Sequence, residues 1–334
     1  MKVAVIGAGP IGSIFGGHIA MEGHEVWMVD PQAPIVDGIK KNGLVLHMAQ
    51  GEGTPVVRKV APVKATTNAD EVGKVDLVIV AVKGFWTRSA VENISKVASP
   101  YTAILSCQNG LGNADILDEF FPGQVAYNIV VLGGAPVPGS PGEYTGTLSA
   151  GGIHAPGTTK YPEKIGHILE GLEKILEPSD FTFKYLPQKE VDKVLWQKLC
   201  LNIVVNSCTA VAECAMDAVY GEESGIELGN HIVDEALQVC NAMGVELTRE
   251  EVDPYVPIFK REKFPNDTYR HFPSMCVDVI NRRRLETDFL NGAVVREGKK
   301  LGIPTPYNET MHLLMKLVEN TYQDRWAIVK GLDK

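Results

Sequence analysis

Residues 2–30 read KVAVIGAGPIGSIFGGHIAMEGHEVWMVD, and this stretch decides the predicted fold. Its first part, Lys2–Ile6, is an apolar, β-branched run that is typical of a buried parallel strand. A glycine-rich turn follows, then a helical pattern over Ser13–Glu22 and a second strand over Glu25–Val29. This succession of strand, turn, helix and strand predicts a βαβ unit, the building block of a doubly wound parallel sheet.

The turn carries the pattern Gly7-Ala8-Gly9-Pro10-Ile11-Gly12, and we assign all of these residues to cofactor binding. Gly7 allows the tight turn, Gly9 lets the backbone approach a pyrophosphate, and Gly12 permits close packing of helix on strand. The pyrophosphate is expected to rest on the helix N-terminus, where N–H groups and the helix dipole attract anions. Because the motif follows a strand and opens a helix, it indicates a dinucleotide site rather than an ordinary glycine-rich turn.

Asp30 closes the second strand, at the position where an acidic residue accepts hydrogen bonds from the adenosine ribose. Its charge would repel a 2′-phosphate, so the sequence favours NAD(H) over NADP(H). The residues that follow, Pro31 and Gln32, bring no positive charge to bind that phosphate. The alternative interpretation of Asp30 is a solvated carboxylate in a turn.

The rest of the chain divides into a part with alternating strands and helices and a part that is mostly helical. In the first part we expect strands at Val56–Val60, Leu77–Ala81, Ala103–Ser106, Val125–Val131, Thr147–Ala150 and Phe181–Tyr185, and helices at Thr87–Ala98 and Ala114–Phe120. The glycine- and proline-rich stretch Gly133–Gly157 is expected to form a loop and an edge strand. In the second part we expect helices at Lys189–Met216, Gly225–Met243, Phe272–Leu301 and Asn308–Tyr322. We therefore predict an α/β fold, with a Rossmann dinucleotide-binding domain over residues 1–185 and an all-helical substrate and catalytic domain over 186–334.

The composition is that of an ordinary soluble globular protein of 334 residues, with 45% hydrophobic and 22% charged residues. A net charge of −9 argues against nucleic acid and anionic membranes as partners. The six cysteines form no CxxC pair and no zinc-binding spacing, so we expect no metal and a reducing, cytoplasmic location. The first residues lack the features of a signal peptide, and apolar runs such as Val75–Val82 are too short to span a bilayer.

Two further loops follow predicted strands and therefore reach the edge of the sheet where doubly wound folds bind ligands. Lys83 comes after the strand Leu77–Ala81, and Asn109 comes after Ala103–Ser106. Lys83 is suited to a cofactor hydroxyl or phosphate, and Asn109 to the nicotinamide ribose. The alternative is that both loops are plain turns, since Asn-Gly is a common turn pair.

A polar stripe interrupts the apolar helix predicted over Lys189–Met216. Lys198, Asn202 and Asn206 recur every four residues, so they share one face of that helix. Because buried polar groups need partners, a ligand is a natural explanation for this stripe. The alternative is a seam of hydrogen bonds between helices.

Two more polar residues lie in the region 272–292. Ser274 follows Pro273 and has the pattern of a helix N-cap. Glu286 lies among alternating charges and would pair with an arginine on the surface in the simplest interpretation. Periodicity alone does not single out Glu286.

Together these segments resemble the ketopantoate reductase (2-dehydropantoate 2-reductase) family. The matching stretches occur in family order and span almost the whole chain: MKVAVIGAGPIGS at 1–13, AVKGFWT at 81–87, QNGLGN at 108–113, WQKLCLNIVVNSCTA at 196–210, SMCVDVINRRRLETDFLNG at 274–292 and LGIPTP at 301–306. The resemblance implies a Rossmann domain joined to a helical domain like that of 6-phosphogluconate dehydrogenase, with the active site in the cleft between them. It also implies NAD(P)-dependent hydride transfer to the C2 carbonyl of a 2-oxo acid such as 2-dehydropantoate, a step of pantothenate biosynthesis.

The resemblance assigns roles to individual residues of this chain. Lys198 falls on the catalytic lysine, and Glu286 on the glutamate beside the catalytic site. Asn202, Asn206 and Ser274 fall on substrate-binding positions. Two matches lie in the cofactor loops, namely Lys83 in the AVK motif and Asn109 in the QNG motif.

The sequence departs from the family pattern at several positions. The family usually has a basic residue after the second strand and uses NADP, whereas this chain has Asp30, Pro31 and Gln32. Leu285 replaces the usual threonine before the glutamate, and Tyr144 stands where many members have histidine. The aromatic segment Glu251–Tyr269 is expected to cover the cleft and to admit a substrate unlike ketopantoate.

Several functions stay open on these grounds. A dehydrogenase of the same family would act on a different oxo or hydroxy acid, running in the oxidative direction. An opine-type dehydrogenase would need a site for a second large substrate. A nucleotide-sensing protein without enzymatic activity would be expected to lack the catalytic lysine or glutamate, but both are present. A homodimer is expected only because it is the commonest oligomer.

Overall fold

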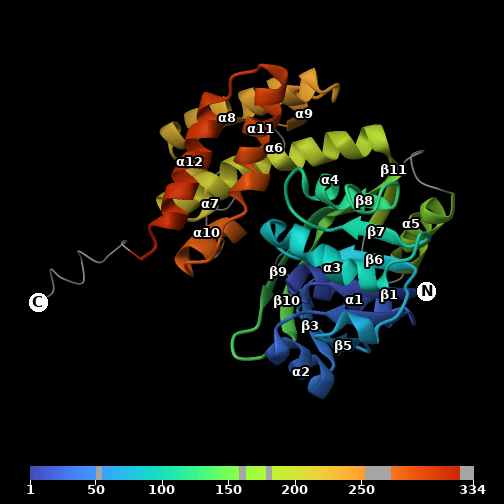
Figure 1. The fold of residues 1–334 in the computed structure, drawn as a ribbon. Helices are drawn as coiled ribbons and strands as arrows, with labels where there is room; N and C mark the ends of the chain where they lie inside the picture. Colours follow the sequence, from blue (N-terminus) through green and yellow to red (C-terminus); the bar gives the residue numbers. More distant parts are fainter. Residues whose placement is uncertain (50–54, 158–162, 178–182, 253–271, 324–334) are drawn as a thin grey trace, which may run out of the picture. The chain divides into compact units, whose positions relative to one another are not determined.

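The computed structural model describes residues 1–49, 55–157, 163–177, 183–252 and 272–323. The chain folds into two compact units, Met1–Val191 and Asp192–Lys334 (Figure 1). The sequence places the boundary after residue 185 instead. The predicted aromatic segment Glu251–Tyr269 lies outside the described residues beyond Val252.

The first unit contains a parallel sheet with the strand order β5-β2-β1-β6-β7-β8. Its strands are β1 (Lys2–Ile6), β2 (Glu25–Val29), β5 (Lys64–Thr66), β6 (Leu77–Val80), β7 (Ala103–Ser106) and β8 (Val125–Tyr127). The chain runs outward from β1 in one direction through β2 and in the other through β6. The carboxyl end of β1 is therefore the switch point at which such sheets bind ligands. This topology confirms the predicted Rossmann-type fold.

The two faces of this sheet are covered by different helices. Val3 and Val5 of β1 join one buried cluster, while Ala4 and Ile6 join another, as the period of two in a strand requires. The first cluster is completed by helices α1 (Pro10–Met21) and α5 (Glu163–Leu176). Helices α3 (Thr87–Val97) and α4 (Asn113–Asp118) complete the second.

A second sheet in the same unit has the order β11-β10-β3-β4, with β9 paired to β10. Its strands are β3 (Leu44–Ala49), β4 (Val57–Ala61), β9 (Ile129–Pro136), β10 (Glu143–Gly157) and β11 (Phe183–Pro187). Helix α1 contacts strands of both sheets, and α2 (Ala33–Asn42) lies against β3 and β5 (Figure 1).

The prediction of a loop and an edge strand over Gly133–Gly157 is wrong. The stretch forms the second half of β9 and all of β10, and β10 pairs with β3, β9 and β11. Its glycines serve packing instead, because a Cβ at Gly146 would lie 2.6 Å from Ile14 Cδ1 of α1. At Gly134 the same atom would lie 2.9 Å away.

The second unit is helical, as predicted. Its helices are α6 (Gln188–Ala212, whose first residues belong to the first unit), α7 (Met216–Gly221), α8 (Glu223–Ala242), α9 (Arg249–Val252), α10 (Ser274–Ile280), α11 (Asn291–Leu301) and α12 (Pro306–Asn320). The single helix predicted over Phe272–Leu301 is wrong, because the chain leaves the helix after Ile280. Arg282 has a φ of 53°, a left-handed conformation that an α-helix does not accommodate.

Helix α6 is long and apolar enough to span a bilayer by length and composition, the one such helix among the described residues. However, 61% of its most apolar window is buried inside the protein. A helix that is apolar on most sides and buried in this way is the core helix of a globular unit. All six cysteines lie in described segments as free thiols.

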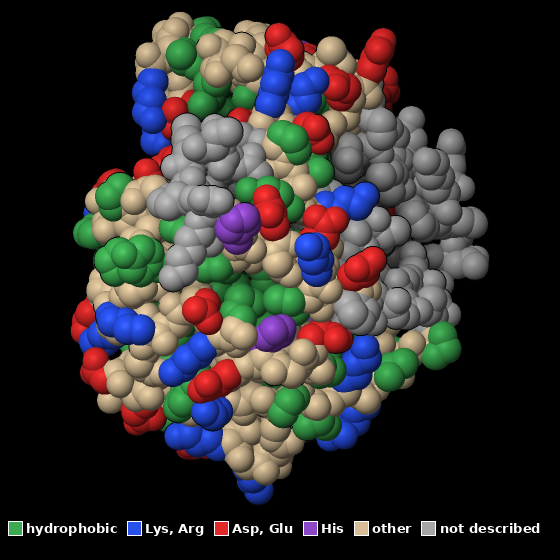
Figure 2. All heavy atoms as spheres, turned by 90° about the vertical axis from the view of Figure 1, so that its right-hand side faces the viewer, with side chains coloured by type: hydrophobic (Ala, Val, Ile, Leu, Met, Phe, Trp, Pro, Cys, Tyr) green, Lys and Arg blue, Asp and Glu red, His purple; other side chains and the backbone are tan. Residues whose placement is uncertain are grey.

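Figure 2 shows acidic and basic side chains interspersed over the face that it views. Apolar side chains emerge between them, and the described side chains on this face form no broad basic surface. A surface of mixed charge does not concentrate a polyanion, because the fields of neighbouring opposite charges largely cancel.

Candidate cofactor and substrate site

The three glycines of the loop between β1 and α1 have different surroundings. Gly7 has a φ of 101°, and a Cβ there would lie 3.0 Å from Val82 N. A Cβ at Gly12 would lie 2.3 Å from the Gly7 carbonyl oxygen. By contrast, a Cβ at Gly9 would meet no atom within 4 Å. Packing therefore requires glycine at two positions, while Gly9 has open space before it.

Asp30 is a buried residue that fixes this loop from the end of β2. Its side chain is 5% exposed, so the alternative of a solvated turn carboxylate is wrong. Oδ2 accepts a hydrogen bond from the Ala8 N–H at 2.8 Å, and Oδ1 accepts one from the Gln32 N–H at 2.9 Å. The carboxylate thus links the glycine loop to the turn after β2.

Two hydroxyl groups hold the carbonyl of the same loop residue, and the sequence did not identify either of them. Ser13 Oγ donates to the Ala8 carbonyl at 3.1 Å, and the Tyr144 hydroxyl donates to it as well. Burial raises the pKa of Tyr144 to about 12, and the charge of Asp30 adds to this shift. The phenol therefore keeps its proton, and its role as a donor, at neutral pH.

A buried polar network joins the two other loops at the carboxyl edge of the sheet. Gln108 Nε2 donates to the Thr87 hydroxyl at 2.7 Å and to the Val82 carbonyl at 3.0 Å. The Thr87 hydroxyl donates to Asn113 Oδ1 at 2.8 Å, and Asn113 Nδ2 donates to the Asn109 carbonyl at 2.9 Å. These bonds fix the positions of the loops that contain the predicted cofactor residues.

Lys83 and Asn109 lie half-buried in these loops. Lys83 directly precedes the short 3₁₀ helix η2 (Gly84–Trp86), and Asn109 lies in the turn before α4. Lys83 follows β6, the strand next to β1, and Asn109 follows β7, which lies one strand further along the sheet. Their place at the carboxyl edge agrees with a cofactor site, and their contacts with a cofactor stay a prediction.

The polar stripe on α6 runs from a partly exposed end to a buried end. Lys198 and Asn202 are half-buried, and Asn206 is 7% exposed. Asn206 Oδ1 accepts a hydrogen bond from the Met275 N–H at 3.3 Å, in the first turn of α10. Ser274 begins that turn, so the fold brings two of the predicted substrate residues to one place. Pro273 holds the N-cap position, and the N-cap interpretation of Ser274 is therefore wrong.

Glu286 lies in the segment between α10 and α11, before the 3₁₀ helix η6 (Thr287–Phe289). The residue is 7% exposed, so it is a buried residue and not a solvated surface carboxylate. The neighbouring Asp288 does form a partly exposed ion pair, because Lys316 Nζ of α12 lies 2.6 Å from its Oδ2. The expected proximity of Glu286 to Lys198 stays a prediction.

A second buried network, which the sequence did not indicate, supports α6 from the side. Asn291 Nδ2 donates to the Ile203 carbonyl of α6 and to Asn308 Oδ1, each at 3.1 Å. The Glu235 carboxylate accepts the N–H groups of Tyr307 and Asn308, at 2.8 and 2.9 Å. It thereby caps α12, whose positive N-terminus stabilises a carboxylate.

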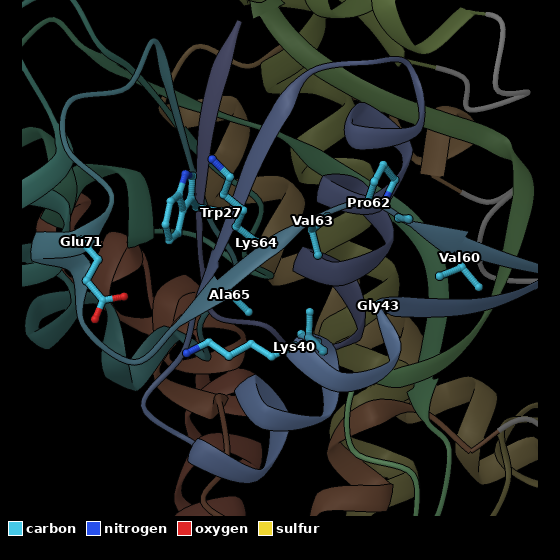
Figure 3. A pocket seen from close by; sticks show the side chains of 11 residues that line it. Trp27, Lys40, Gly43, Val60, Pro62, Val63, Lys64, Ala65 and Glu71 are labelled. Carbon is cyan, nitrogen blue, oxygen red and sulfur yellow. The ribbon is translucent and has the colours of Figure 1, made fainter.

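A cavity of about 520 Å³ in the first unit lies apart from the predicted residues (Figure 3). It is lined by Trp27, Ile39, Lys40, Gly43, Val60, Ala61, Pro62, Val63, Lys64, Ala65 and Glu71. Lys64 Nζ sits 5.0 Å from the centroid of the Trp27 ring and 2.8 Å from Glu25 Oε1, so its charge is already compensated. None of the predicted site residues lines this cavity.

Two family models cover most of the chain. Residues 3–150 match the model described as ketopantoate reductase PanE/ApbA, and residues 190–319 match the model of its C-terminal part. A 2-dehydropantoate 2-reductase of Streptococcus pyogenes serotype M1 is 30% identical over 309 residues, covering 92% of this chain and 94% of that protein. The enzyme of the same name from Aquifex aeolicus is 29% identical over 322 residues, covering 96% and 97%.

Solved structures of the same fold include members of this family. The PanE/ApbA family ketopantoate reductase from Ralstonia eutropha JMP134 superposes with a TM-score of 0.82 at 28% identity, covering 97% of this chain and 100% of that one. A D-mandelate dehydrogenase in ternary complex with NADH and anilino(oxo)acetate also reaches a TM-score of 0.82, at 25% identity and the same coverage. With its Rossmann-type first unit, helical second unit and matched sequence models, the chain belongs to the ketopantoate reductase family.

Proposed function

We propose that this protein reduces a 2-oxo acid, such as 2-dehydropantoate, to the corresponding 2-hydroxy acid. The observation that carries this proposal is the stripe of Lys198, Asn202 and Asn206 on one face of helix α6. A lysine and two amides on one face provide a proton donor and neutral groups that bind a carboxylate. The first unit would bind the nicotinamide cofactor and the second would bind the substrate. A cytoplasmic location fits the six free thiols.

When bound, the reduced nicotinamide supplies the hydride for the C2 carbonyl. Lys198, as an ammonium group, polarises this carbonyl and donates a proton to the alkoxide oxygen. Glu286 favours the charged form of the lysine, since a nearby carboxylate stabilises an ammonium group. Asn206 uses its Oδ1 for the Met275 N–H, so its Nδ2 hydrogens are left for the substrate carboxylate, together with Asn202 and Ser274.

We propose NAD(H) as the preferred cofactor, because Asp30 places a buried carboxylate beside the glycine loop. The carboxylate is held there by the N–H groups of Ala8 and Gln32, so it cannot swing away from an approaching 2′-phosphate without breaking these bonds. The NADH complex of the structurally similar D-mandelate dehydrogenase supports the same preference.

Asp30→Asn should raise the ratio of kcat/KM for NADPH to that for NADH by about tenfold or more. The substitution removes the repelling charge but keeps one oxygen that accepts from Ala8, and a change of about 1.4 kcal/mol in the interaction is sufficient for this ratio. Steady-state kinetics with both cofactors measure it. A wild-type protein that uses NADPH as well as NADH would contradict the preference.

The reaction itself is tested by mixing the purified protein with NADH or NADPH and a panel of 2-oxo acids. Loss of nicotinamide absorbance with 2-dehydropantoate is the expected result. Turnover only after addition of an amine would favour an opine-type dehydrogenase instead. Cofactor binding without turnover of any panel member would favour a nucleotide sensor and contradict the proposed activity.

A dehydrogenase acting on a different 2-hydroxy acid is the second candidate function. The structural similarity to D-mandelate dehydrogenase favours it, as does the proposed use of NAD. The panel should therefore include the 2-oxo acid of mandelate, and the reverse reaction should be run with NAD and 2-hydroxy acids. A kcat/KM for mandelate or its oxo acid above that for the pantoate pair would select this candidate.

A further inference from the structure

Ala8 is held by hydrogen bonds on both sides of its Cα atom. Its N–H donates to Asp30 at 2.8 Å, and its carbonyl accepts from Ser13 and from Tyr144. All of these groups are buried, since Ser13 is fully buried and Tyr144 and Asp30 are 2% and 5% exposed. Both peptide groups that flank the Ala8 Cα atom therefore have fixed orientations.

The orientation of the Ala8 carbonyl determines where the next N–H points. The peptide between Ala8 and Gly9 is planar and trans, so its carbonyl and its N–H point in opposite directions. Tyr144 and Ser13 draw the carbonyl into the core, and the Gly9 N–H consequently points away from the core. Gly9 is half-exposed and has open space where a Cβ would stand.

We propose that Tyr144 is a positioning residue for the cofactor: through the Ala8 peptide it aims the Gly9 N–H at the pyrophosphate and keeps Asp30 in place for the ribose. This inference rests on the proposed binding of NAD(H). It assigns part of the cofactor site to the second sheet of the first unit, because Tyr144 is a residue of β10.

The surroundings of Tyr144 suit this role. In β10 it is in register with Leu46 of β3 on one side and Pro136 of β9 on the other, so its backbone is fixed by strands on both sides. Its pKa of about 12, raised by burial, keeps the phenol protonated over the pH range in which the enzyme would work. The donor to the Ala8 carbonyl is therefore constant over that pH range.

The test is a calorimetric titration of NADH into the full-length Tyr144→Phe variant, with kcat measured at saturating NADH. Loss of one buried hydrogen bond that orients a binding group is expected to raise the Kd for NADH roughly three- to tenfold. The value of kcat should change little, because Lys198 and the substrate-binding residues are untouched. A residue that only stabilised the fold would lower the melting temperature without this increase in Kd.

Thr102→Val is the matched control in the same unit. The Thr102 hydroxyl is fully buried and donates to the Val75 carbonyl at 2.7 Å, just before β7 begins. It therefore lies at the amino edge of the parallel sheet, opposite the glycine loop. The variant should lose stability but keep the wild-type Kd for NADH.

If Tyr144→Phe does not fold, Ser13→Ala is the alternative variant for the test, because it removes the other donor to the Ala8 carbonyl. It should raise the Kd in the same direction by a smaller factor. An unchanged Kd in the folded variant would overturn the role of Tyr144 and leave the proposed function intact, and so would an equal increase in Thr102→Val. A wild-type protein that binds neither NADH nor NADPH would overturn both.

Discussion

Lys198→Ala is expected to lower kcat for reduction of the preferred 2-oxo acid by about a hundredfold or more. Hydride transfer to a ketone creates an alkoxide, and Lys198, on the polar face of α6, is the proton donor that we propose for it. Alanine cannot supply the proton or stabilise the developing charge. The Kd for NADH should stay within about twofold of wild type, since Lys198 is not assigned to the cofactor. Stopped-flow or steady-state measurement of NADH consumption gives kcat, and calorimetry gives the Kd.

Lys193→Ala is the matched control for this experiment. Lys193 lies on the same helix, and its Nζ is 3.2 Å from Glu251 Oε1 in an ion pair that is about one third exposed on both sides. Pairs of this kind contribute about 0–1 kcal/mol, so the control should fold and retain near-wild-type kcat. Near-normal kcat in Lys198→Ala would refute its role as the general acid. A comparable loss in both variants would indicate damage to α6 instead.

The difference between Lys198 and Glu286 shows how far periodicity can locate a site. Lys198, Asn202 and Asn206 were predicted as one face because they lie on a regular helix, where a spacing of four residues fixes direction. Glu286 lies in the non-helical segment between α10 and α11, after Arg282 has turned to positive φ. Periodicity gives no direction to a side chain in such a segment, so only the resemblance to a family identified it.

The cofactor loop also depends on some residues that the sequence could identify and on one that it could not. The glycine pattern could be interpreted from the sequence because it lies within one βαβ unit, where Gly7 and Gly12 allow close packing and Gly9 leaves open space. Tyr144 could not, since its bond to Ala8 joins residues 136 positions apart. It also belongs to a stretch whose glycines indicated a loop, whereas Gly134 and Gly146 are there to let α1 approach the second sheet. Contacts between the second sheet and the glycine loop or α1 join distant parts of the chain, so they leave no pattern in the local sequence.

An added methyl group should lower the stability of the protein at Gly12 but not at Gly9. Gly12→Ala is expected to lower the free energy of unfolding by about 3 kcal/mol, because its Cβ would overlap the Gly7 carbonyl and no side-chain rotation relieves a backbone contact. Gly9 has a φ of −71°, which alanine adopts readily, and its Cβ would meet open space. Gly9→Ala should therefore unfold at the wild-type denaturant concentration.

The affinity for NADH should distinguish the role of Gly9 from that of Gly12. In Gly9→Ala the methyl group would occupy the space that we propose for the pyrophosphate at the helix N-terminus, so the Kd should rise by about tenfold or more in a protein of unchanged stability. Urea unfolding followed by circular dichroism and calorimetric titration with NADH measure the two effects on the same samples. If Gly9→Ala bound NADH with wild-type affinity, the open space before Gly9 would not be the pyrophosphate site. The glycine pattern would then reflect only the packing that Gly7 and Gly12 require.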